Sequence, residues 1–132
     1  MKPLITTVVL GSVLMMSGAA VAGEADVVGV RMVERGGTYS FSVTVHHADA
    51  GWEHYADKWE VVAPDGTVID TRELAHPHDN EQPFTRNLGG VRIPADLSKV
   101  RVRAHDKVHG YGGREMEIDM KTGEASPAGG QS

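Results

Sequence analysis

The sequence of 132 residues contains no cysteine. This absence excludes a disulfide framework, and it excludes a lipid attached to an N-terminal cysteine. A blue-copper centre is excluded as well, because that centre needs a cysteine thiolate as a ligand. The start of the chain also lacks a twin arginine, which favours export of an unfolded chain over export of a folded one.

An excess of positive charge is missing too. The chain has 13 Lys and Arg residues against 18 Asp and Glu residues, a formal net charge of −5 with neutral histidines. Nucleic acid and anionic lipid are therefore poor partners, because their own charge is negative. The acidic balance suits an exported protein, or one that attracts cations.

The first residues have the pattern of a secretory signal peptide. Lys2 precedes the apolar run "PLITTVVLGSVLMM", and small residues then end in Ala20-Val21-Ala22. This pattern predicts a signal peptide over residues 1–22 and a mature chain in the periplasm or secreted. A retained membrane anchor is the alternative, but the run is interrupted before it reaches the roughly 20 apolar residues that a span needs. No membrane contact is expected after cleavage.

The remaining 110 residues suffice for one domain. The final segment, "TGEASPAGGQS", lacks large apolar residues and is rich in Gly, Ser and Pro. This composition predicts a disordered tail over residues 122–132 and a folded domain over residues 23–121.

Within the folded domain, apolar residues alternate with polar ones, as they do in half-buried strands. The segment "TYSFSVTVHH" places Tyr39, Phe41, Val43 and Val45 on one side. No window predicts an amphipathic helix. Seven short strands with turns between them predict an all-β, seven-stranded antiparallel sandwich of the immunoglobulin or fibronectin-III type, with Trp59 in its core. The expected strands cover residues 26–33, 38–47, 58–64, 67–74, 84–93, 99–106 and 114–120.

This topology predicts that all seven histidines gather at one end of the sandwich. In a sandwich of this kind the second, fourth and sixth connections emerge at the same end. The histidines lie in these three connections or at the strand ends beside them: His46, His47, His54, His76, His78, His105 and His109.

Clustered imidazoles favour a borderline divalent metal, and Cu(II) or Zn(II) is the expected ion. The preferred ligands are His76, His78, His105 and His109. The second choices are His47 and His54, although His47 also suits a hydrogen-bonded role that closes the core. Nearby carboxylates could complete the shell or orient a histidine: Asp49, Glu53, Asp57, Asp79, Glu81 and Asp106.

Two other function classes stay open. No G-x-S-x-G motif is present, and the glycine-rich stretch "HGYGG" lacks the Lys-Ser/Thr pair of a phosphate-binding loop. The sequence therefore favours a protein without enzymatic activity, although metal-assisted catalysis would need only an open coordination position. Alternatively, Trp52, Tyr55 and Tyr111 could form aromatic loops that bind a protein or a small ligand.

Three stretches carry a resemblance to known sequences: "GWEHYADKWEVV", "HPHDNEQPFTR" and "VRAHDKVHGYGG". Together they resemble a family of small uncharacterised exported bacterial proteins, over about residues 25–120. The resemblance implies export but transfers no chemistry, since no function is assigned to that family.

Overall fold

The computed structural model describes residues 24–49, 51–78 and 81–128. These residues form eight β-strands. The strands are β2 (Asp26–Arg35), β3 (Thr38–His46), β4 (Ala56–Val62), β5 (Val68–Glu73), β6 (Phe84–Val91), β7 (Lys99–Asp106), β8 (Met116–Asp119) and β9 (Ala125–Pro127). Within the described ranges, no helix is long and apolar enough to cross a membrane.

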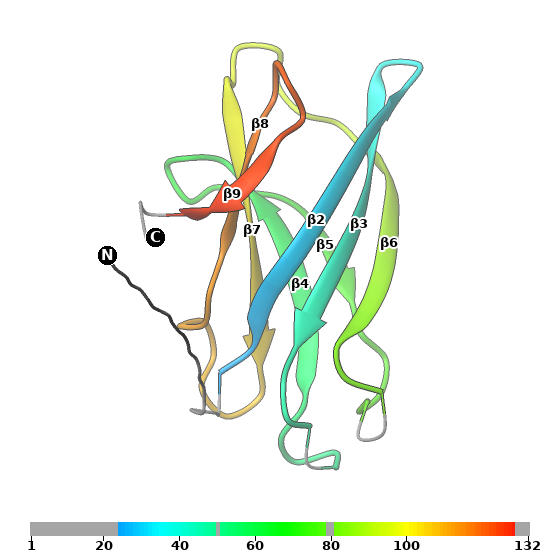
Figure 1. Cartoon of the computed structure of the whole chain (residues 1–132), viewed down its shortest axis with the longest axis vertical. Coiled ribbons are helices and arrows are strands. Elements are labelled where there is room, and N and C mark those ends of the chain that lie inside the picture. Colours follow the sequence, from blue (N-terminus) through cyan, green and yellow to red (C-terminus); the bar gives the residue numbers. More distant parts are fainter. Residues whose placement is uncertain (1–23, 50, 79–80, 129–132) are drawn as a thin grey trace, which may run out of the picture.

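The strands form two antiparallel sheets that face each other (Figure 1). The smaller sheet has the order β2-β3-β6, and the larger has the order β5-β4-β7-β8-β9. The expected all-β sandwich is therefore confirmed, with eight strands among the described residues instead of the expected seven. Its likeness to immunoglobulin or fibronectin-III domains stays a prediction of architecture.

The additional strand, β9, lies inside the segment whose composition predicts a disordered tail. Residues 125–127 pair with β8, and Ala125 lies opposite Ile118. Ala125 also packs against the core. A short edge strand needs only a few backbone hydrogen bonds and one small apolar contact, so a segment rich in Gly, Ser and Pro can supply it.

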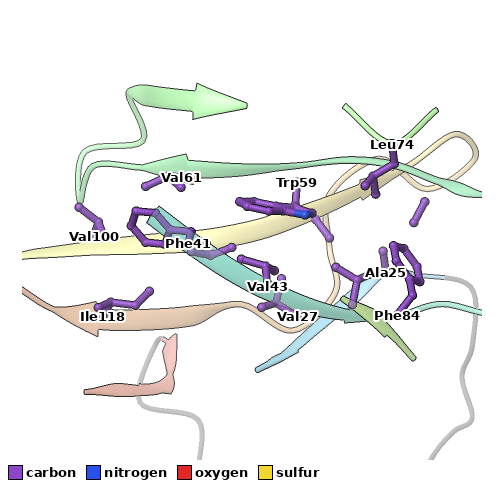
Figure 2. Packing of buried hydrophobic residues seen from close by; sticks show 14 of the residues in the cluster. Ala25, Val27, Phe41, Val43, Trp59, Val61, Leu74, Phe84, Val100 and Ile118 are labelled. Carbon is purple, nitrogen blue, oxygen red and sulfur yellow. The ribbon is translucent and has the colours of Figure 1, made fainter. Parts of the chain in front are cut away.

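The core follows from the period-two pattern of the sequence. Phe41, Val43 and Val45 on β3 are fully buried, as the alternation predicts. Trp59 on β4 is also fully buried, and Figure 2 shows its indole in the middle of the cluster, between Phe41 and Leu74. Burial of each large apolar side chain contributes about 1.5–3 kcal/mol, so this cluster is the main source of stability.

Three connections meet at one end of the sandwich, the lower end in Figure 1. They join β3 to β4, β5 to β6 and β7 to β8. All seven histidines lie in these connections or at the strand ends beside them. We call this end the histidine end.

The start of β2 is fastened to the last of these connections. The backbone N–H of Val27 donates to the carbonyl of Arg114 at 2.8 Å, and the N–H of Arg114 donates to Asp26 Oδ1 at 2.7 Å. A Cβ atom on Gly113 would lie 1.9 Å from the carbonyl oxygen of Ala25. The two segments can approach this closely only because residue 113 has no side chain.

Candidate metal centre

His47 is buried at the end of β3 and is held by a carboxylate. It continues the inward-facing positions of that strand, and its Nδ1 lies 2.5 Å from Asp49 Oδ1. An acceptor at Nδ1 fixes the proton of a neutral imidazole on that nitrogen. The lone pair of Nε2 then points to the opposite side of the ring, as it does in metal sites where a carboxylate orients a histidine.

His54 and Asp106 bring two further donor groups to this side of His47. The Nε2 atom of His54 lies 3.2 Å from Nε2 of His47 and 3.3 Å from Asp106 Oδ1. One ligand atom from each of the three residues lies within 4.8 Å of the others, so this group could hold a metal ion. Two nitrogens that bind zinc tetrahedrally at about 2.0–2.1 Å are about 3.3–3.4 Å apart, close to the separation of the two imidazoles.

The two oxygens of Asp106 have different surroundings. Oδ1 accepts hydrogen bonds from the backbone N–H groups of Val108 at 2.9 Å and His109 at 2.6 Å. Oδ2 is buried and has no hydrogen-bond partner among the described residues. It lies 3.8 Å from Nε2 of His47. A buried carboxylate oxygen without a donor is costly, and a cation bound there would remove that cost.

Both buried carboxylates are stabilised in their charged form. Burial raises the pKa of Asp49, but hydrogen bonds from His47, His78 and Ala56 outweigh it, so the pKa lies below its ordinary value. Burial also raises the pKa of Asp106, and the backbone hydrogen bonds from His109 and Val108 again outweigh it. Two carboxylates with completely buried side chains therefore flank His47, and this concentration of negative charge attracts a cation.

His78 is buried nearby but engaged elsewhere. Its ring stacks on Phe84 with centroids 3.9 Å apart, and Arg86 donates to its Nε2 at 2.9 Å. Burial lowers the pKa of His78, and the charges of Arg86 and His76 lower it further. His78 Nδ1 lies 3.8 Å from Asp49 Oδ2, so Asp49 stands between His78 and the imidazole of His47.

The remaining preferred histidines occupy three different places. His76 is exposed, and its ring lies 4.7 Å from that of His78. His105 is bonded to Asp57, with Nδ1 2.6 Å from Oδ1, on the side of β7 opposite to Asp106. His109 lies beside the group, with Nδ1 3.3 Å from Asp106 Oδ1. The structure thus brings together His47, His54, Asp106 and, next to them, His109.

The other candidate carboxylates do not join this group. Glu53 is exposed, Asp57 binds His105, and Glu81 lies 3.4 Å from Arg86. Asp79 is outside the described residues.

The sequence places these two histidines second, because the inward parity of His47 also fits a hydrogen-bonded residue that closes the core. The inward positions of β3 lead to His47, and those of β7, Val100, Val102 and Ala104, lead to Asp106. The sequence therefore does contain a signal for this group: a polar residue that continues the core-facing series of a strand beyond its last apolar residue.

Comparison with known proteins gives one relative. The chain is 43% identical over 101 residues to a protein of Halomicrobium mukohataei named "Putative lipoprotein". The match covers 76% of this chain and 49% of that protein, so the chain spans about half the length of the curated relative it matches. No family model matches the chain. No solved structure matches it either.

Proposed function

We propose that this protein is an exported β-sandwich that binds a divalent transition metal ion, Cu(II) or Zn(II), through His47, His54 and Asp106. The observation that carries the proposal is the pair of Nε2 atoms 3.2 Å apart beside a buried carboxylate oxygen to which no described residue donates. Two imidazole nitrogens and one carboxylate oxygen are donors that suit these borderline metals.

Three protein ligands leave a fourth position in a tetrahedral shell. His109 is one candidate for it, since its ring centroid lies 5.0 Å from that of His54 and its Nδ1 lies 3.3 Å from Asp106 Oδ1. Water is the other candidate for that position. A carrier or sensor needs no more than this set, whereas a catalyst would need the fourth position free for its substrate.

The location in the periplasm or outside the cell is part of the proposal. It is supported by the signal-like start of the sequence and by the name of the relative, "Putative lipoprotein". The expected signal peptide lies outside the described residues. Intact mass of the exported protein would test it, and a mature chain that begins at Gly23 is the expected result.

Thermal unfolding with and without metal tests the proposed site. Chelator-treated protein should gain stability from Cu(II) or Zn(II), by about 2.7 kcal/mol at a hundredfold excess over the dissociation constant, because the ion binds the folded state. The double variant His47→Ala, His54→Ala should lose this gain, whereas His46→Ala, at an exposed position, should keep it. Full metal-induced stabilisation in the double variant would overturn the proposal.

A second candidate function rests on one exposed aromatic residue. Trp52 is 64% exposed at the histidine end, and its ring makes a T-shaped contact with that of Tyr55, with centroids 5.6 Å apart. Exposed tryptophans frequently anchor a partner. A non-enzymatic module that binds a protein or small ligand through this loop becomes the leading proposal if the metal titration gives no stabilisation.

A further inference from the structure

The connection that follows β7 begins with a tight hairpin, residues 106–110. The N–H of Asp106 donates to the carbonyl of Gly110 at 3.1 Å, and the N–H of Gly110 donates back to Asp106 at 3.0 Å. Gly110 has a φ of 70°, which residues with side chains rarely adopt. This hairpin carries both Asp106 and His109, so its position decides where these two side chains lie relative to His54.

Tyr111, the next residue, returns to the outer face of the larger sheet. Its hydroxyl donates to Glu60 Oε2 at 3.0 Å. The guanidinium of Arg103 lies over its ring, 4.1 Å from the centroid, and the ring of His105 meets it edge-on at 4.8 Å. Tyr111 is therefore attached by a hydrogen bond, a cation–π contact and a ring contact, all to residues of β4 and β7.

Glu60 is an unusual anchor because it is almost completely buried on a face that points away from the core. It is 4% exposed, and it also accepts a hydrogen bond from Arg103 Nε at 3.0 Å. Lys58 Nζ lies 3.7 Å from Glu60 Oε2, the oxygen that accepts the hydrogen bond from Tyr111.

We propose that Tyr111, held by Glu60 and Arg103, is a positioning residue for the metal site. This inference rests on the proposed function. The hairpin is fixed at one end by β7, which ends at Asp106, and at the other end by the contacts of Tyr111. With both ends fixed, Asp106 and His109 are held in place before the ion arrives, and little conformational freedom is lost on binding.

Release of Tyr111 removes the contacts that hold the segment after the hairpin against the larger sheet, so that this segment is next fastened only at Arg114. The glycines on either side of Tyr111, Gly110 and Gly112, both have positive φ and allow the segment to pivot. The metal would then have to order His109 itself, which weakens binding without removing any ligand.

The test compares two tyrosine variants in the full mature chain, Tyr111→Phe and Tyr39→Phe. Tyr39 lies on β3 near the opposite end of the sandwich, so its variant controls for loss of a phenol hydroxyl. Cu(II) affinity is measured by competition with a chelator, and the electron paramagnetic resonance spectrum of bound Cu(II) reports on its ligand geometry. Tyr111→Phe should bind about tenfold more weakly than wild type with an altered spectrum, and Tyr39→Phe should match wild type in both.

Amide hydrogen exchange of the metal-free proteins supplies a readout that does not depend on the metal. Residues 108–110 should exchange faster in Tyr111→Phe, while the core of β3 is unchanged. Unchanged affinity, spectrum and exchange in Tyr111→Phe would overturn the positioning role alone. Failure of the wild-type protein to bind Cu(II) or Zn(II) would overturn the proposed function, and the positioning role with it.

Discussion

Asp49 Oδ1 lies 2.5 Å from Nδ1 of His47, and neither side chain has any exposed surface. A second Asp–His pair of nearly the same length, Asp57 with His105 at 2.6 Å, lies on the outer face of the larger sheet. The chain thus contains a buried pair beside the proposed metal ion and a partly exposed pair away from it.

The first prediction compares these two pairs. Asp49→Asn should weaken Cu(II) or Zn(II) binding by roughly 10- to 100-fold, because loss of a carboxylate behind a ligating histidine lowers the basicity of the ring and releases its orientation. Asp57→Asn should leave metal affinity unchanged. Isothermal titration calorimetry of both variants decides the matter, and equal affinities would mean that His47 is not a ligand.

A second prediction concerns acid stability of the metal-free protein. The pKa values of Asp49 and Asp106 are lowered in the folded state, so the unfolded state binds more protons as the pH falls. The stability that they contribute is present above the unfolded pKa of about 4 and is lost as the pH falls through the lower folded values. Urea unfolding between pH 7 and pH 2 should show this loss below about pH 4. Asp49→Asn should have a lower free energy of unfolding at pH 7, and that free energy should fall less steeply with acid than in the wild type. An unchanged dependence on pH would contradict the role given to Asp49.

The third prediction uses the close approach of the chain start to the connection between β7 and β8. Gly113→Ala should destabilise the domain by about 1–3 kcal/mol or more, because the Cβ of the alanine would overlap the carbonyl of Ala25. Gly66→Ala is a suitable control: both positions lie in connections between strands, but a Cβ on Gly66 meets nothing within 4 Å, and only the positive φ there would strain an alanine. Thermal denaturation should rank Gly113→Ala well below Gly66→Ala, and the reverse order would show that the contact is not maintained.

The fourth prediction is the pH dependence of metal binding. Protonated imidazole cannot ligate, and the ordinary pKa of histidine is about 6.5. The increase in melting temperature that Zn(II) causes should therefore be full at pH 7.5 and should disappear as the pH falls from about 6.5 to 5. Parallel melts with and without Zn(II) separate this effect from the acid sensitivity of the fold. An increase that persists at pH 5 would point to carboxylate ligands in place of imidazoles.

Much of the fold could be predicted because the alternation of apolar and polar residues shows which side of each strand faces the core. All seven expected strands are present, and the alternation on β3 and β7 gives the correct inward residues. The strand β9 was not predictable in this way, since its three residues have too few apolar side chains to show a period. Backbone pairing with β8 stabilises it, and a composition argument does not detect pairing.

The candidate site was predictable only to the level of one end of the sandwich. Which histidines meet there depends on how the loops fold, and two contacts of His78 decide it. Arg86 on β6 binds His78 Nε2, and Asp49 binds the backbone N–H of His78 at 2.6 Å. These contacts hold the His-x-His motif away from His54. The spacing of Arg86 and Asp49 from the motif in the sequence does not reveal that either residue binds it.

The two tryptophans of the chain lie in opposite environments. Trp59 is completely enclosed in the core, whereas Trp52 is 64% exposed and only two residues from His54. Their emission should therefore differ in wavelength, with the blue component from the interior and the red component from the surface. Because Cu(II) quenches nearby fluorophores, the red component can follow occupancy of the site while the blue one follows unfolding, and the unlabelled wild-type chain carries both optical reporters.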